Sequence, residues 1–252
     1  VAAPCREIHQ DPEKVYQHTS KGNTIAVVSD GTRVLGLGDI GAKAGLPVME
    51  GKALLFKYLG GVDAVPVMLD TKDPQELIEA VLLMQHTFGG INLEDISQPK
   101  CFHILDELRE RAEIPVWHDD QQGTATVTLA GLMNALKVVG KEKQEISIAF
   151  IGAGASNVAI SRLIFGWGVN PEACFMVDST GILGMHREDI KQKQDQYCDK
   201  WRLCQTTNAE GRKGGIAEAM KDVDAVIALC TPGPNVIKPE WVREMKDDAI
   251  VF

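Results

Sequence analysis

The 252-residue sequence contains no apolar run that approaches 18 residues, so it predicts no helix long enough to cross a bilayer. The sequence has fewer basic than acidic residues: it contains 26 lysines and arginines and 35 aspartates and glutamates, which gives a net charge of −9. This balance argues against a general nucleic-acid binder and against a protein that binds anionic membranes. Repeats and low-complexity segments are also missing, and the composition, 44% hydrophobic and 24% charged, is typical of a globular protein.

Paired cysteine motifs are absent as well. The six cysteines are scattered, with no CxxC pair and no spacing typical of a zinc finger. In a chain of this size, that pattern indicates reduced, mostly buried thiols and a cytoplasmic protein. The sequence begins at Val1 without an initiator methionine and stops inside the apolar run 249–252, which predicts an interrupted strand. We therefore expect a fragment, cut at both ends, of a longer protein.

Apolar runs, turns and helical patterns alternate along the chain. We expect strands at 24–29, 32–37, 64–69, 89–93, 114–117, 146–151, 174–177 and 225–229, and helices at 50–59, 74–87, 101–111, 124–139, 157–165 and 216–221. The first two strands flank Asp30-Gly31, which is a hairpin signal. Strands that alternate with helices predict right-handed βαβ units and parallel sheets covered on both faces.

The pattern changes character near residues 120–125, which predicts two domains. We expect an α/β fold in which a Rossmann-like parallel-sheet domain, residues 122–252, binds a dinucleotide and packs on an N-terminal α/β domain. The N-terminal domain, residues 1–121, would bind the substrate and a metal ion.

Glycine-rich turns occur twice, as GxGxxG at 36–41 and as an imperfect copy that begins at Gly152. The second copy directly follows a predicted strand and directly opens a predicted helix, where backbone N–H groups and the helix dipole attract a pyrophosphate. The first copy is separated from the next predicted helix by residues 42–49, so we interpret it as a turn. We assign five residues of the second copy to cofactor binding: Gly152, Gly154, Ala155, Ser156 and Asn157.

An acidic residue stands where the ribose of a dinucleotide would lie. Asp178 ends the strand 174–177, 24 residues beyond Gly154, and is placed to hydrogen-bond an adenosine-ribose hydroxyl. Thr231, just beyond the strand 225–229, joins the cofactor-binding set. Asp178 would repel a 2′-phosphate, and no basic residue follows it before Arg187, which favours NAD slightly over NADP. We therefore retain both NAD and NADP as candidate cofactors.

Two acidic pairs, Glu94-Asp95 and Asp119-Asp120, each stand at the C-terminal end of an apolar stretch. The carboxyl ends of parallel strands are where ligands gather, and four converging carboxylates would repel one another. A hard divalent cation, Mg²⁺ or Mn²⁺, would resolve that conflict with oxygen ligands. Solvated loop residues are the alternative, but the polar run 118–124 after a buried strand favours the metal site, with His118 as a supporting neighbour.

Lys52 lies at the start of the apolar helix predicted at 50–59. A helix N-terminus and a nearby cation both disfavour the ammonium form, so we expect a lowered pKa and a base that works near neutral pH. The alternative is an ordinary surface lysine at a helix start.

Taken together, these motifs resemble the malic enzyme family, most closely its compact microbial-type branch. The resemblance runs along nearly the whole chain in consistent order, at 1–5, 21–23, 30–41, 51–52, 93–95, 114–125 and 152–154. It implies three metal ligands: Glu94, Asp95 and Asp120. It also implies Asp119 as a residue that assists from beside the cation, Lys52 as the general base and Arg33 as a residue that faces a substrate carboxylate.

The implied reaction is the metal-dependent oxidative decarboxylation of L-malate to pyruvate and CO₂, with reduction of NAD or NADP. A malolactic enzyme, which gives lactate, and a non-catalytic nucleotide-binding module are the alternatives. We expect a homodimer with a small-molecule substrate and no nucleic-acid or membrane partner. In this family a catalytic tyrosine precedes the segment that begins here at Val1, and asparagine-bearing loops follow the strand that ends at Phe252. We expect both in the parent protein.

Overall fold

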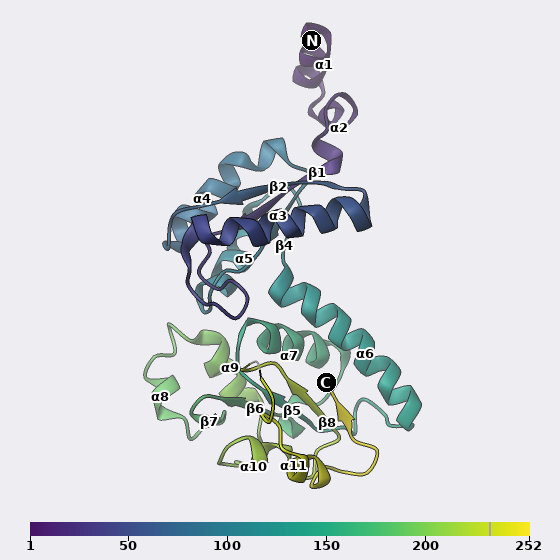
Figure 1. The fold of residues 1–252 in the computed structure, drawn as a ribbon, viewed down its shortest axis with the longest axis vertical. Helices are drawn as coiled ribbons and strands as arrows, with labels where there is room; N and C mark the ends of the chain where they lie inside the picture. The colour runs from purple at the N-terminus through teal and green to yellow at the C-terminus, as the bar shows by residue number, and fades with distance from the viewer. Residues whose placement is uncertain (232) are drawn as a thin grey trace. The chain divides into compact units, whose positions relative to one another are not determined.

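Each half of the chain folds around its own parallel sheet (Figure 1). The computed structural model describes residues 1–231 and 233–252. These divide into two compact units, Val1–Asp119 and Asp120–Phe252, which are described separately below.

The sheet of the first unit has four parallel strands in the order β2-β1-β3-β4. Its strands are β1 (Thr24–Ser29), β2 (Asp63–Met68), β3 (Gly90–Leu93) and β4 (Val116–His118), and its long helices are α3 (Gly41–Gly60), α4 (Pro74–Met84) and α5 (Lys100–Arg111). The connection from β1 to β2 runs in the opposite direction to the connections that follow. Right-handed crossovers therefore place α3 on one face and α4 and α5 on the other.

Short helical segments precede this sheet and border it. They are α1 (Ala2–Gln10), η1 (Pro12–Lys14), α2 (Val15–His18), η2 (Lys21–Asn23) and η3 (Gln85–Thr87). None of the residues of α1 or α2 is buried, so these two helices add little to the core of the first unit.

The second unit contains a five-stranded sheet in the order β7-β6-β5-β8-β9, with only β7 antiparallel. Its strands are β5 (Ile148–Ile151), β6 (Phe175–Asp178), β7 (Gly181–Ile182), β8 (Ala225–Ala228) and β9 (Ile250–Val251). Its helical elements are α6 (Thr124–Val139), α7 (Ala155–Trp167), η5 (Pro171–Ala173), α8 (Glu188–Lys191), α9 (Cys198–Thr206), α10 (Ile216–Met220) and α11 (Pro239–Arg243), and a π-helical turn, η4 (Asp119–Gly123), leads into α6.

The core of the second unit lies on both sides of its sheet. All four residues of β5 are buried, which is why this strand is a continuous apolar run rather than an alternating one. α6 and α7 lie on one side of the sheet, and α10 and α11 lie on the other (Figure 1). The α/β prediction with parallel sheets is therefore confirmed.

Three expectations for the segment 30–60 are wrong. Residues 32–37 form no strand; Val34 makes a single bridge to Gly38, and β1 pairs with β2 and β3 instead of closing a hairpin. The helix expected at 50–59 begins at Gly41 and contains Pro47 within it. Consequently residues 42–49 do not separate the first GxGxxG from a helix, although that turn still follows a loop rather than a strand.

No helix among the described residues has the length and hydropathy needed to cross a membrane.

Candidate functional site

Three carboxylates come together where β3 and β4 end. Glu94 and Asp95 directly follow β3, and Asp120 follows β4 by two residues. One carboxylate oxygen from each of the three lies within 4.8 Å of the others. Glu94 and Asp95 are only 6% and 5% exposed, which is unusual for acidic residues. Three of the four acidic residues singled out in the sequence thus form a group that could hold a metal ion.

The backbone and one buried amide hold these acids in place. The Asn92 side-chain amide donates to Glu94 Oε2 at 2.8 Å, and the Glu94 N–H donates to the Val28 carbonyl at 2.9 Å. Asp95 has φ +53°, a left-handed conformation that is costly for a residue other than glycine and that often marks a functional position. Its carbonyl accepts a hydrogen bond from the Arg33 N–H at 2.9 Å.

Asn92 is a residue that the sequence interpretation missed. It is fully buried in β3, and it lies two positions before Glu94. Side chains two apart on a strand project to the same face, so a lone amide in the apolar stretch Gly90–Leu93 was the available signal.

This donor set fits a divalent cation. It offers carboxylate oxygens only, which suits Mg²⁺ or Mn²⁺ better than a soft metal. Close, largely buried carboxylates repel one another unless a cation or protons neutralise them. Glu94, Asp95 and Asp120 are therefore the residues that would hold the metal ion. His118, the last residue of β4, is buried and lies two residues before Asp120 in the sequence.

Lys52 contacts two carboxylates of the first unit. Its Nζ lies 2.6 Å from Asp119 Oδ2 and 3.2 Å from Glu94 Oε1. Because α3 begins at Gly41, Lys52 lies in the middle of the helix, and the expected helix N-terminus is not there. Burial lowers the pKa of Lys52, but the hydrogen bond to Asp119 and the charge of Glu94 outweigh it, so the pKa is raised. The expected lowering of this pKa is therefore wrong for the chain without bound metal.

Arg33 is exposed in the loop between β1 and α3. This loop is fastened at its base: Asp30 Oδ1 accepts from the Thr32 hydroxyl at 2.6 Å, and Lys100 donates to Asp30 Oδ2 at 2.5 Å. Within the described residues the Arg33 guanidinium forms no ion pair, so it is available to a ligand.

The turn between β5 and α7 has the features of a dinucleotide-binding turn. Gly152 has φ +103°, and a Cβ on it would lie 2.6 Å from the Leu229 carbonyl oxygen, so only glycine fits. A Cβ on Gly154 would meet nothing within 4 Å, so the turn is open at this point. Gly154 is also the N-cap of α7, where a helix N-terminus can receive a phosphate.

Asn157 and Ser156, expected in the cofactor set, brace this turn. The buried Asn157 amide donates to the carbonyls of Ile151 and Gly152 at 3.0 and 2.8 Å. The Ser156 hydroxyl donates to the Asp120 carbonyl at 2.8 Å. Ala155 is the first residue of α7. These contacts are with protein atoms, so they position the turn and leave the backbone N–H groups of the helix start for a ligand.

Asp178 ends β6 as expected, and two cations surround it. Arg187 Nη1 lies 2.9 Å from Asp178 Oδ1, and Lys200 Nζ lies 3.3 Å from Asp178 Oδ2. Burial by itself raises the pKa of Asp178. The hydrogen bonds from Arg187 and from the Thr180 N–H outweigh burial, so the pKa of Asp178 is lowered. Thr231 lies in an exposed bend three residues after β8 ends.

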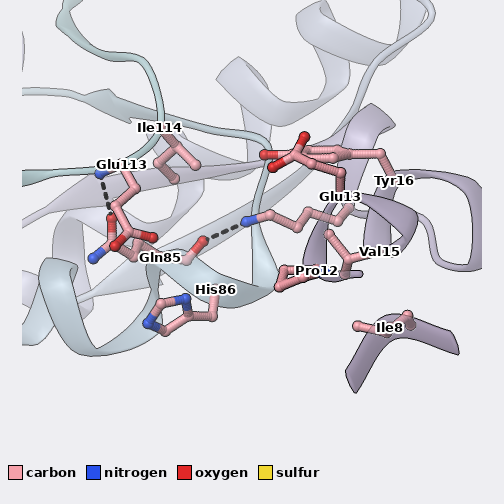
Figure 2. A pocket seen from close by; sticks show the side chains of 10 residues that line it. Ile8, Pro12, Glu13, Val15, Tyr16, Gln85, His86, Glu113 and Ile114 are labelled. Atoms are coloured by element: carbon pink, nitrogen blue, oxygen red, sulfur yellow. Dashed lines mark hydrogen bonds between the residues drawn. The ribbon is translucent and has the colours of Figure 1, made fainter. Parts of the chain in front are cut away.

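A cavity of about 340 Å³ lies elsewhere in the first unit, and no candidate residue lines it. Glu13 and Tyr16 come from the N-terminal helical segments, and Gln85 and Glu113 come from the sheet-bearing part (Figure 2). Lys21 lines it too, and its ammonium donates to the Gln85 carbonyl at 2.8 Å. Burial lowers the pKa of Lys21, although the charge of Glu113 opposes this.

Fold and site together define an α/β protein with a Rossmann-type dinucleotide-binding unit and a second unit that carries an acidic, metal-type site with a lysine beside it. Two family profiles cover most of the chain. Residues 1–109 match the family described as malic enzyme, N-terminal domain, and residues 121–250 match malic enzyme, NAD binding domain.

Individual relatives agree with these matches. The chain is 46% identical to the NAD-dependent malic enzyme of Geobacillus stearothermophilus and 45% identical to the bifunctional malic/malolactic enzyme of Bacillus subtilis. All of this chain aligns in both cases, with 51% and 59% of the relative. The crystal structure of malic enzyme from Pyrococcus horikoshii matches all of the chain, and 58% of its own length, at 55% identity with a TM-score of 0.94. Further relatives are named NADP-dependent malic enzymes.

The chain belongs to the malic enzyme family, which confirms the resemblance seen in the motifs. It spans about half the length of the curated relatives it matches.

Proposed function

We propose that the protein to which this chain belongs catalyses the oxidative decarboxylation of L-malate to pyruvate and CO₂, with reduction of NAD or NADP. The observation that carries this proposal is the contact of Lys52 Nζ with Asp119 Oδ2 at 2.6 Å and with Glu94 Oε1 at 3.2 Å. A lysine held against metal-type carboxylates is the arrangement that proton removal beside a Lewis acid requires.

In the proposed reaction, Lys52 would take the proton from the C2 hydroxyl of malate, and the nicotinamide cofactor, when bound, would supply the acceptor for the C2 hydride. A base must be unprotonated before it acts, and the contact with Asp119 Oδ2 gives the ammonium proton of Lys52 an acceptor. Arg33 faces a malate carboxylate from the exposed loop after β1. Glu94, Asp95 and Asp120 would hold a divalent cation, which would supply Lewis-acid stabilisation for negative charge on the C2 oxygen.

Nicotinamide reduction by L-malate in the presence of Mn²⁺, measured on the full-length protein, tests the proposal. We expect Lys52→Ala to lower kcat/KM at least about 100-fold, because a general base contributes on this scale. Lys57→Ala is the matched control on the same helix, since Lys57 is exposed and pairs only with Asp63 among the described contacts. Activity retained in Lys52→Ala, or lost equally in both variants, contradicts the assignment of the base.

The metal site has its own test. Equilibrium dialysis of Mn²⁺ against the unaltered protein and against Asp120→Ala should show clearly weaker binding in the variant. Identical binding contradicts the proposed ligand set. A protein that binds nucleotide but neither binds Mn²⁺ nor oxidises malate would be a non-catalytic module.

The malolactic reaction is the second candidate, because one relative is named a bifunctional malic/malolactic enzyme. That reaction gives lactate without net reduction of the nucleotide. Analysis of the product from labelled malate distinguishes the two: pyruvate with a stoichiometric amount of reduced nucleotide supports the first proposal, and lactate supports the second.

We also propose a homodimer in the cytoplasm. The α3 face formed by Leu54, Leu55, Tyr58 and Leu59 is exposed, and large exposed apolar patches mark interaction sites. None of the six cysteines forms a disulfide, as is usual in a reducing compartment. Analytical ultracentrifugation of the full-length protein and of Tyr58→Glu tests the first point, with dissociation expected in the variant; fractionation of cells tests the second.

A further inference from the structure

Arg33 is the one exposed residue in a buried segment of the first unit. Every other residue between 25 and 34 is buried. Its two neighbours, Thr32 and Val34, are only 6% and 0% exposed. Because protein interiors are closely packed, the backbone on either side of Arg33 cannot shift without disturbing the core. The position of the Arg33 side chain therefore depends on what holds this buried backbone.

A buried ion pair holds the residues just before Arg33. The Asp30 side chain is fully buried, and its Oδ2 accepts from Lys100 Nζ at 2.5 Å. Its other oxygen, Oδ1, accepts from the Thr32 N–H at 3.0 Å and from the Thr32 hydroxyl at 2.6 Å. Lys100 also donates to the Lys72 carbonyl at 3.2 Å. A buried charge pair is costly to break, so Asp30 is a fixed point for the Thr32 hydroxyl.

The Thr32 hydroxyl also contacts the segment that carries a metal-type acid. Its Oγ1 accepts a hydrogen bond from the Ser97 N–H at 3.0 Å, although the two residues are 65 positions apart in the sequence. The next residue, Arg33, donates its N–H to the Asp95 carbonyl at 2.9 Å. Asp95 has φ +53°, and such a conformation persists only where the surroundings enforce it. Consecutive residues of the Arg33 loop thus hold both ends of the segment 95–97.

We propose that Thr32 is a positioning residue for the reaction. Its hydroxyl fixes the Arg33 loop to the segment 95–97, so that the group for a malate carboxylate and one ligand of the metal ion keep a fixed position relative to each other. Thr32 is buried and acts only through Arg33 and Asp95. Correct placement of a substrate held at two points depends on such a fixed spacing. The inference rests on the roles that the proposed function gives to Arg33 and Asp95.

Thr32→Val in the full-length protein tests the inference, because valine keeps the shape of threonine and removes the hydroxyl. Steady-state kinetics at saturating Mn²⁺ and equilibrium dialysis of Mn²⁺ are the two measurements. We expect the KM for malate to rise about tenfold, with kcat and the KM for nucleotide within about twofold of the unaltered values, on the scale of a lost buried hydrogen bond. Mn²⁺ binding should weaken about threefold or more, because Asp95 loses support. Thr32→Ser, which keeps the hydroxyl, should restore both.

Thr19→Val is the matched control. The Thr19 hydroxyl also donates to one group and accepts from another, the Val15 carbonyl at 2.6 Å and the Lys21 N–H at 3.1 Å, but it lies in the N-terminal helical segments. We expect this variant to leave the KM for malate and Mn²⁺ binding unchanged.

A double-mutant cycle tests whether Thr32 acts through Arg33. In an Arg33→Ala background, Thr32→Val should raise the KM for malate by less than about twofold, because the residue that it positions is already gone. Independent effects of the two substitutions, with the full rise retained in this background, overturn the proposal.

The remaining outcomes are also decisive. An unchanged KM for malate, unchanged Mn²⁺ binding, or a Thr32→Ser variant that behaves like Thr32→Val overturns the role of the hydroxyl, as does an equal change in Thr19→Val. If Thr32→Val does not fold, Thr32→Ala, which leaves space for water, is measured in its place with the same expected directions. An unaltered protein that neither binds Mn²⁺ nor oxidises malate shows that the proposed function itself is wrong, and this inference fails with it.

Discussion

At the scale of single residues, the side-chain amide of Asn92 orients the carboxylate of Glu94. Asn92 Nδ2 donates to Glu94 Oε2 at 2.8 Å from a fully buried position in β3. Partners of metal-ligating carboxylates fix ligand orientation, and their removal typically weakens metal binding by about 10- to 100-fold. We therefore expect Asn92→Ala to weaken Mn²⁺ binding by about tenfold or more, measured by equilibrium dialysis.

Asn134→Ala provides the control for that experiment. Asn134 is exposed on α6 and hydrogen-bonds only to the Ala130 carbonyl among the described contacts, so its loss should leave Mn²⁺ binding unchanged. Unchanged Mn²⁺ binding in Asn92→Ala would show that Glu94 needs no such support, or that it does not bind the metal.

Lys52 shows what a single sequence leaves out at this scale. Its position near acidic segments was predictable from the motifs, but the direction of its pKa shift was not. The helix that carries it begins at Gly41, inside a segment with several glycines and Pro47 that favours a loop. The carboxylates that hold its proton lie on other elements, and Asp119 is 67 residues away along the chain.

At the scale of elements, the turn between β5 and α7 separates a structural glycine from a binding glycine. A side chain at Gly152 would combine a strained backbone, φ +103°, with a contact of 2.6 Å to the Leu229 carbonyl. A methyl group at Gly154 has space in the protein. We expect Gly152→Ala to lower both the melting temperature and the affinity for nucleotide. We expect Gly154→Ala to lower only the affinity, because close approach of the pyrophosphate needs a bare backbone there.

Differential scanning calorimetry and NADH titration of the two variants measure these effects. If Gly154→Ala and the unaltered protein bind NADH with equal affinity, the pyrophosphate does not bind at this turn. A Gly152→Ala variant that melts like the unaltered protein would contradict the steric argument.

The Asp224 carboxylate links the segments that precede β5 and β8, and its contribution to the free energy of unfolding depends on pH. The Asp224 carboxylate accepts from the Ser147 N–H and from Lys141 and Lys246 at 2.8, 3.0 and 2.7 Å. Burial raises the pKa of Asp224, but these partners outweigh burial and lower the pKa to about 2, below the ordinary value of 3.8. The stabilisation is therefore present above the unfolded pKa and is lost as the pH falls toward the folded pKa. At neutral pH it amounts to about 2 kcal/mol.

Urea denaturation measures this contribution. We expect Asp224→Asn to lower the free energy of unfolding by about 2 kcal/mol near pH 7, and the difference from the unaltered protein should shrink as the pH falls below about 4. Asp222→Asn is the control, because Asp222 is exposed and its left-handed backbone, φ +54°, suits asparagine. A difference that stays constant down to about pH 2.5 would contradict the ionic origin of the effect.

Most elements with strong periodicity were predictable from the sequence, including α6, whose bounds agree, and the buried strands β1, β3 and β5, whose bounds shift by no more than two residues. The failures have local causes. Thr32–Val34 follows Asp30-Gly31 like a hairpin strand, but Thr32 hydrogen-bonds Asp30 and the chain turns back at Gly38. The short helices α8, α9 and α11 carry little apolar surface, so their formation depends on packing that periodicity does not reveal.

At the scale of the whole molecule, most of the candidate site could be predicted because its residues directly follow strands. Parallel strands bring their carboxyl ends to one edge, so Glu94 after β3 and Asp119 after β4 both come close to Lys52, which lies on α3. The charges that surround Asp178 could not be predicted in the same way. Arg187 and Lys200 follow β7 and belong to segments whose course is set by tertiary contacts.

Each unit has its own sheet and core, which predicts that the second unit folds alone. β5, β6 and β8 bury a continuous apolar cluster, which includes Phe175 and Val226, together with residues of α10 and α11. The candidate nucleotide residues Gly152, Gly154 and Asp178 all lie within this unit. We therefore expect residues 120–252, expressed alone, to unfold cooperatively in urea and to bind NADH with an affinity within about threefold of that of the full chain.

Residues 120–252 carrying Gly152→Ala serve as the control for that measurement, since we expect this variant to bind NADH more weakly in the isolated unit, as we expect in the full chain. A second unit that unfolds without cooperativity would show that its stability depends on the first. A folded second unit that does not bind NADH would show that the nucleotide site needs residues outside 120–252. Mn²⁺ added to the isolated unit should have no effect on its melting temperature, because Glu94 and Asp95 are missing from it.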